Sequence, residues 1–327
     1  MINLKVRQYI SLLLGISLAF TSATFAQTWK PDRNVELVIP TSPGGSNDIA
    51  GRTLHKLLND LKLLPVSSSV ANRSGGEHNV AYTYVSQRTG DAHTLGIMST
   101  PMLVNAVEGR SQLTHNDVSP IAYLFTEPMI ALVRADSPLK TGRDVIDALR
   151  KNPGALSIAL TSTGHRVSIG MPMLKGGVTL KGIRMPAFKG GGETVTAVLG
   201  GHADLLITSV STSVPHIASG QMRGLAVSSS KRLDGALAAV PTWQELGFQS
   251  SGSWKGVMGP KGITPAQVAY WEDVMRRASQ SDELRQYAEQ NQWLLEFKGA
   301  AETKKWLDEE FAALKTAMTA LGLVRQQ

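Results

Sequence analysis

The stretch VELVIPTSPGGSNDIAGRTLHKLLNDL, residues 35–61, decides the fold of this chain. Its first six residues are mostly apolar, which is typical of a buried strand. Ala50 and the leucines at 54, 57, 58 and 61 then recur at helical spacing and predict an amphipathic helix. The sequence therefore predicts a strand, a tight turn over 41–48 and a helix in immediate succession.

The turn between this strand and this helix has the features of an anion-binding site. Gly44 and Gly45 allow positive φ and a close approach of a ligand to the backbone. Asp48 stands where we expect the N-cap of the helix, and we assign it that structural role before any role in binding. The first N–H groups of a helix have no intrahelical partner, so they can bind a carboxylate or a phosphate. We interpret the turn as one half of an anion-binding cleft.

Strand, turn and helix recur in this order along the chain. A strand over 66–70 leads to Gly75 and Gly76, and a strand over 94–98 ends at Ser99. Such alternation predicts an α/β fold in which mainly parallel sheets are flanked by helices. Similar turns follow at 161–165 and 188–193, and a strand over 203–207 runs into Ser209.

The chain is expected to form two lobes joined by two crossover strands, with a cleft between them. An apolar segment over 121–133 provides the first crossing, and Leu225–Val227 provides the return. The segment 233–265 is rich in Gly and Pro and is expected to be irregular, and the remainder to be helical. The predicted divisions are residues 27–127 with 226–327 for lobe 1 and 128–225 for lobe 2.

The N-terminal 26 residues have the pattern of a signal peptide. Lys5 and Arg7 precede an apolar segment over 10–20, and Thr24–Ala26 fits a cleavage site. We therefore expect a periplasmic protein that is cleaved after Ala26. The chain contains no cysteine, which excludes disulfides, thiol nucleophiles and cysteine-based metal sites.

Charge and composition favour a small-molecule partner over a nucleic acid. The formal net charge is +7, and aromatic residues make up 6% of the chain. Nucleic-acid binding requires clustered basic residues with aromatic side chains for stacking, and this composition does not supply them. A weakly positive field is compatible with an anionic solute, although it is also ordinary for a soluble protein.

Several segments recur in a characteristic order and spacing: Val38–Pro40, Pro43–Gly45, Asp48, Asn72–Gly75, Gly90–Leu95, Phe188–Gly192, Leu199–Asp204, Leu225–Val227, Val240–Thr242 and Gly256–Gly262. In these segments the chain resembles the substrate-binding proteins of tripartite tricarboxylate transporters, often called the Bug family. The resemblance implies a two-lobed type II periplasmic-binding fold, no catalytic residues, no cofactor and no metal. It also implies a small carboxylate ligand, membrane transporter subunits as partners, and a monomer.

The resemblance implies binding largely through backbone N–H groups at facing glycine turns. On the first lobe we predict ligand-binding roles for Ser42, Pro43, Gly44, Gly45, Asn47, Asp48, Gly75, Gly76, His78 and Ser99. On the second lobe we predict them for Thr161, Ser162, Thr163, Gly164, His165, Lys189, Gly190 and Ser209.

The chain departs from the family pattern at both turns. Glu77 and His78 stand where further glycines are common, and whether they line the pocket is left open. Leu160 and His165 flank the second-lobe turn where Ser and Ser/Thr are usual, and Ser168 stands where His is common. These departures concern the identity of the ligand and leave the fold unaffected.

Alternative functions use some of the same residues. His78 and His165 could suggest a metal, but no spacing of His, Asp or Glu here matches a ligand pattern. A hydrolase would use Ser162 with His165, but the nucleophile elbow motif is missing. A sensor that presents a bound carboxylate to a two-component histidine kinase is the main alternative to a transport receptor.

Overall fold

The protein is described by a computed structural model covering residues 29–188, 190–248, 250–320 and 322–324. The expected signal peptide, its cleavage site and Lys189 lie outside the described residues. Within the described part of the chain, no helix combines the length and the apolar character that crossing a bilayer requires.

The first lobe is built on a six-stranded sheet with the order β10-β4-β9-β3-β1-β2. β1 is parallel to β2 and β3, β9 is antiparallel to β3 and β4, and β10 is antiparallel to β4. The strands are β1 (Val35–Ile39), β2 (Ser68–Asn72), β3 (Thr94–Ser99), β4 (Val118–Glu127), β9 (Ser253–Pro260) and β10 (Leu294–Lys298).

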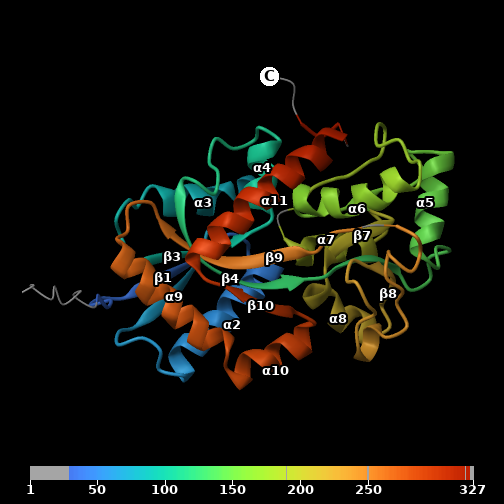
Figure 1. The fold of residues 1–327 in the computed structure, drawn as a ribbon. Coiled ribbons are helices and arrows are strands. Elements are labelled where there is room, and N and C mark those ends of the chain that lie inside the picture. Colours follow the sequence, from blue (N-terminus) through green and yellow to red (C-terminus); the bar gives the residue numbers. More distant parts are fainter. Residues whose placement is uncertain (1–28, 189, 249, 321, 325–327) are drawn as a thin grey trace, which may run out of the picture.

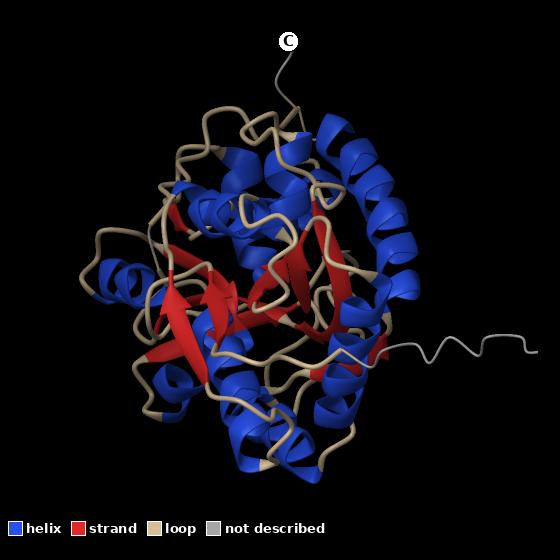
Figure 2. Ribbon diagram, turned by 90° about the vertical axis from the view of Figure 1, so that its left-hand side faces the viewer, coloured by secondary structure: helices blue, strands red, loops and turns tan. Residues whose placement is uncertain are grey.

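Helices cover both faces of this sheet, as Figure 2 shows. One core packs α2 and α9 against the sheet and includes Leu54, Leu57 and Trp271. The other lies under α3, α4 and α11 and includes Tyr82, Leu103 and Leu307. The helices are α2 (Ser46–Asp60), η1 (Gly76–His78), α3 (Asn79–Ser86), α4 (Pro101–Val107), α9 (Pro265–Ser279), α10 (Asp282–Asn291) and α11 (Ala300–Ala320).

The second lobe is built on a four-stranded sheet with the order β6-β7-β5-β8. β6 is parallel to β7, whereas β5 is antiparallel to β7 and β8. Its elements are β5 (Met129–Arg134), α5 (Gly142–Lys151), β6 (Ile158–Ala159), α6 (Thr163–Lys175), α7 (Gly191–Leu199), β7 (Leu205–Ser209), α8 (Val210–Ala218), β8 (Met222–Val227) and η2 (Gly235–Leu237).

The direction of each strand follows from how the chain crosses between the lobes. Five strands lead into turns or helices at their carboxyl ends: β1, β2, β3, β6 and β7. The chain leaves lobe 1 along β4, passes Pro128 and enters lobe 2 along β5; it returns along β9 (Figure 1). A strand that enters a lobe at the crossing must run away from it, so β5 and β9 are antiparallel to both of their neighbours. The sheets are therefore mixed, and the expected parallel order is limited mainly to β1–β3 and β6–β7.

The return crossing lies later in the sequence than predicted. β8, which contains Leu225–Val227, is hydrogen-bonded to β5 in the second sheet. Leu233, Leu237 and Val240 also pack in the core of that lobe. The chain returns at Gly252, and β9 occupies the middle of the first sheet inside the segment expected to be irregular. Because β9 contains Lys255, two glycines and a terminal proline, its sequence did not read as a buried strand.

Candidate ligand-binding site

A cavity between the lobes, about 550 Å³ with its mouth included, lies at the carboxyl ends of β1, β3, β6 and β7. Ligands of open α/β sheets bind at this edge because the connecting loops and helix N-termini gather there. Lobe 1 contributes Thr41, Gly45, Ser46, Asn47, His78, Ser99, Thr100, Pro101, Gly252, Ser253 and Lys255. Lobe 2 contributes Met129, Thr161, Ser162, Gly164, His165, Gly190, Gly191, Thr208, Ser209 and Thr212.

Four helices of eight residues or more begin at this cavity. The N-cap residues of α2, α6, α7 and α8 are Gly45, Ser162, Gly190 and Ser209, and all four line it. None of the four caps its helix through a side-chain hydrogen bond. The first N–H groups of these helices therefore donate to no cap side chain, although Val210 N–H of α8 donates to Pro128 O. The positive ends of four helix dipoles converge on one space.

Four side chains of the lining have a buried polar atom without a hydrogen-bond partner. They are Thr41 Oγ1, Asn47 Oδ1 and His78 Nδ1 on lobe 1, and Thr212 Oγ1 on lobe 2. Buried polar atoms are normally paired, and a group of unpaired ones around a cavity indicates that a bound solute or water completes them. Because they come from both lobes, such a solute would contact both.

The lobes approach each other closely around the cavity. A Cβ placed on Gly190 would lie 3.8 Å from Cβ of Ser42, across the cleft. A Cβ placed on Gly164 would lie 3.4 Å from Cγ2 of Thr100, again across the cleft. Both distances are ordinary van der Waals contacts, so a Cβ would fit at 164 or 190 but would touch the opposite lobe.

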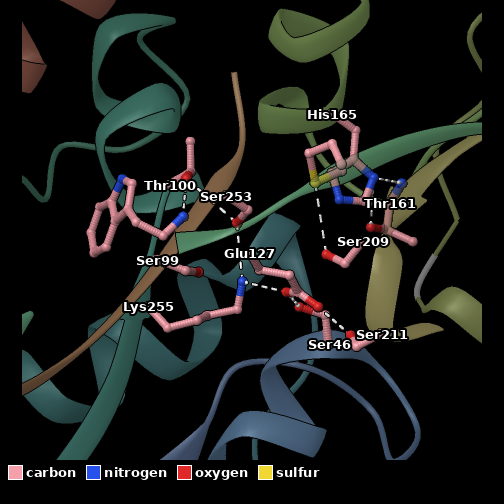
Figure 3. A network of polar contacts seen from close by, with 12 residues as sticks. Ser46, Ser99, Thr100, Glu127, Thr161, His165, Ser209, Ser211, Ser253 and Lys255 are labelled. Atoms are coloured by element: carbon pink, nitrogen blue, oxygen red, sulfur yellow. Dashed lines mark hydrogen bonds and ion pairs between the residues drawn. The ribbon is translucent and has the colours of Figure 1, made fainter. Parts of the chain in front are cut away.

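A buried ion pair between Glu127 and Lys255 lies beside the cavity, at the crossing between the lobes (Figure 3). Lys255 Nζ is 3.1 Å from Glu127 Oε2 and 3.0 Å from Ser253 Oγ. Ser46 of α2 donates to Glu127 Oε2 at 2.5 Å, and Ser211 of α8 donates to Glu127 Oε1. The Lys255 ammonium and the two hydroxyls outweigh burial and hold the pKa of Glu127 below its usual value.

The loop that places His78 in the cavity has an unusual backbone. Gly75, Gly76, Glu77 and His78 have φ values of +129°, +53°, +50° and +80°. This conformation is strained for the two residues with a Cβ, by about 1 kcal/mol each. The Glu77 carboxylate binds Arg110 Nη1 at 2.8 Å, and its carbonyl accepts a bond from Asn105. The loop thus directs His78 into the cavity, while Glu77 does not line it.

The two histidines of the cavity are held neutral. Burial is the main cause that lowers the pKa of His78 to about 3, and His165 and Lys255 contribute. Burial and then Lys255 lower the pKa of His165 to about 4, although Glu127 opposes this. At neutral pH each imidazole is therefore an uncharged hydrogen-bonding group.

Asp48 organises the turn before α2. The N-cap of α2 is Gly45, so the expectation that Asp48 is the N-cap is wrong. Its carboxylate accepts bonds from Gly44 N, Arg52 Nε and Asn72 Nδ2 at 2.8 to 2.9 Å. These bonds fix the 41–48 turn against β2, because the carboxylate joins Gly44 of the turn to Asn72 at the end of β2.

The structure brings ten of the predicted residues together at the cavity: Gly45, Asn47, His78, Ser99, Thr161, Ser162, Gly164, His165, Gly190 and Ser209. Six others, Ser42, Pro43, Gly44, Asp48, Gly75 and Gly76, do not line it and instead shape the two turns of lobe 1. Thr163 begins α6, and Lys189 lies outside the described residues.

Sequence reasoning missed the charged pair and several hydroxyls. The missed lining residues include Thr41, Ser46, Thr100, Thr208, Thr212, Ser253 and Lys255. A charged residue inside the buried strand β9 could have been a signal, as could the Glu127–Pro128 step that ends the first crossing strand. Buried charges require a partner, and two such residues at the crossings can supply each other.

The sequence profile of the tripartite tricarboxylate transporter family receptors matches residues 57–323. The chain belongs to this family. A protein from the tcbD–tcbE intergenic region of Pseudomonas sp. strain P51 is 30% identical over 265 residues, which cover 78% of this chain and 77% of that one. Protein BugT of Bordetella pertussis is 28% identical over 274 residues, covering 81% and 82%.

Solved structures share the fold of this chain. An adipate-bound protein of Rhodopseudomonas palustris superposes with a TM-score of 0.81 at 23% identity, covering 89% of this chain and 98% of that one. MatC of the same organism, with bound malate, has a TM-score of 0.77 at 22% identity, covering 88% and 99%. The two-lobed periplasmic-binding architecture expected from the sequence is confirmed, and the family is one of binding receptors rather than enzymes.

Proposed function

We propose that this protein captures a small organic acid, such as a di- or tricarboxylate, between its lobes in the periplasm and delivers it to the membrane subunits of a tripartite tricarboxylate transporter. The observation that carries the proposal is the convergence of four helix N-termini from both lobes on one cavity. Helix N-termini favour anions, so a carboxylate at each end of the solute would bind to a different lobe.

The rest of the described lining supports an acidic guest. It includes ten hydroxyl side chains, one amide and one lysine, and no Asp or Glu. Hydroxyls can donate to carboxylate oxygens without imposing a fixed charge, whereas acidic side chains in the lining would repel a carboxylate ligand. The related proteins solved with malate and adipate bind ligands of the same class.

Closure follows from the same arrangement. A solute that bonds to both lobes stabilises the state in which they approach, and its differential affinity shifts the equilibrium towards that state. We expect the protein to act as a monomer, because both halves of this site come from one chain.

Titration calorimetry with a panel of mono-, di- and tricarboxylates tests the proposal, with a neutral sugar as the control solute. We expect at least one acid to bind and the sugar not to bind. Binding of the sugar with no response to any acid would contradict it. Delivery is tested by uptake of the bound acid into cells that contain the membrane subunits; we expect uptake to be lost when this protein is deleted. The family does not favour the sensor alternative.

A further inference from the structure

The ion pair beside the cavity is arranged asymmetrically. Lys255 lines the cavity, whereas Glu127 does not and is fully buried behind it. A solute in the cavity therefore meets the ammonium before the carboxylate. Among the described lining residues, Lys255 is the one lysine, and there is no arginine.

The carboxylate of Glu127 does not depend on Lys255 alone. Ser46 and Ser211 both donate to it, one at each oxygen, so three donors share its charge. Lys255 in turn directs two of its three N–H groups to Glu127 and Ser253. One N–H group of the ammonium is left for a further acceptor.

The position of Lys255 places that donor among the other ligand-facing groups. Figure 3 shows its ammonium between Ser253 and Glu127, with Ser46 next to Glu127, while Ser209 and His165 lie on the side of the second lobe. Burial strengthens a charge-assisted bond because little water competes for it. The imidazoles of His78 and His165 are neutral, so they do not duplicate the charge of Lys255.

We propose that Lys255 is a specificity-determining residue that binds one carboxylate of the ligand, and that Glu127 positions it. This inference rests on the proposed function and deepens it: the site selects a dianionic acid over the same molecule with one carboxylate masked. Amino acids are disfavoured as well, because no carboxylate in the described lining is available to pair with an ammonium group.

A purely structural explanation is that the pair only fastens the crossing strands. The two explanations differ in what they predict for selectivity. If the ion pair only holds the crossing strands together, its loss changes the affinity for every ligand by the same factor, because it acts on the lobes. A residue that binds one carboxylate affects only ligands that carry that carboxylate.

The test measures selectivity in the full chain by calorimetry. The probes are malate and adipate, each compared with its monoamide, which removes one charge. Lys255→Met would leave Glu127 unpaired, so the main variant is Glu127→Gln/Lys255→Met, in which the amide keeps the hydroxyl contacts. Lys298→Met is the matched control, since Lys298 is a buried lysine of β10 outside the cavity.

We expect the wild-type protein to prefer a diacid over its monoamide by about tenfold or more, the value of one charge-assisted bond. The double variant should lose most of this preference, and Lys298→Met should keep it. An unchanged ratio in the double variant, or an equal weakening of diacid and monoamide, would overturn the inference while leaving the proposed function intact. If the wild-type protein binds no carboxylate, both proposals are wrong.

Discussion

Arg166 of α6 and Glu108, which follows α4, form an ion pair between the two lobes, with Nη1 3.6 Å from Oε1. Both side chains are largely buried, and Glu108 is also held by Arg110. The pair joins α6 of lobe 2 to the end of α4 of lobe 1. We expect that opening of the lobes would separate its members, so that the pair favours the closed state.

Replacing Arg166 with Met should weaken ligand binding without impairing folding. Loss of one partly buried ion pair is worth about 0.5 to 1 kcal/mol, so the dissociation constant should rise about two- to fivefold. Calorimetry with the acid that the wild-type protein binds best measures this. Arg150→Met, which removes an exposed pair within α5, is the control and should change nothing. Equal affinity in the Arg166 and Arg150 variants would show that the Arg166–Glu108 ion pair does not contribute to ligand binding.

Glu127 and Lys255 should show strong energetic coupling in stability. Glu127→Ala leaves a buried ammonium without its counter-ion and should lower the free energy of unfolding by about 3 to 5 kcal/mol. Replacing both residues, as Glu127→Gln/Lys255→Met, should cost less than the sum of the single changes. Urea denaturation of the wild-type protein, Glu127→Gln, Lys255→Met and the double variant measures the coupling, and additive losses would show that the pair is not a unit.

Gly45→Val should abolish binding and leave the fold intact. Gly45 has φ of −80°, which valine adopts readily, and a Cβ there would lie 3.2 Å from Thr41 Oγ1. The rest of the valine side chain would occupy the space in front of the α2 N-terminus. Calorimetry and thermal unfolding measure the two properties. Gly192→Ala, in the exposed first turn of α7, is the matched control and should bind normally.

Acidification should destabilise the protein through its neutral histidines. The pKa values of His78 and His165 in the folded chain, about 3 and about 4, lie below the value of 6.5 for an unperturbed histidine. Between pH 6.5 and these values the unfolded chain binds protons that the folded chain does not. Stability is therefore complete above pH 6.5 and falls as the pH drops below it, by up to about 1.4 kcal/mol per pH unit for each histidine.

Urea unfolding at pH 7.5 and pH 5.0 tests this for wild type, His78→Gln and His165→Gln. Each variant should lose less stability on acidification than the wild-type protein does. The difference between proteins is the readout because other groups titrate alike in all three. Identical losses would show that neither histidine is kept neutral by folding.

The sequence predicted the turns of this protein better than its crossings. Glycine turns with flanking hydroxyls have a local signal, which is why Gly45, Ser162 and Gly190 were identified and all line the cavity. The position of β9 has no such signal, because it depends on pairing with β3 and β4, which lie far away in the sequence. Lys255 and Glu127 were missed for the same reason: 128 positions separate two residues whose contact exists only in the folded protein.

The central position of β9 also determines the order in which the two sheets can be completed. The second sheet and its cores are made entirely from one continuous stretch between Met129 and Phe248. The first sheet has a gap between β3 and β4 until residues 253–260 have been synthesised and have paired with these strands as β9. The half that begins the chain is therefore the last to be completed, and a chain truncated before β9 would leave unpaired the edges of β3 and β4 that β9 covers in the intact molecule.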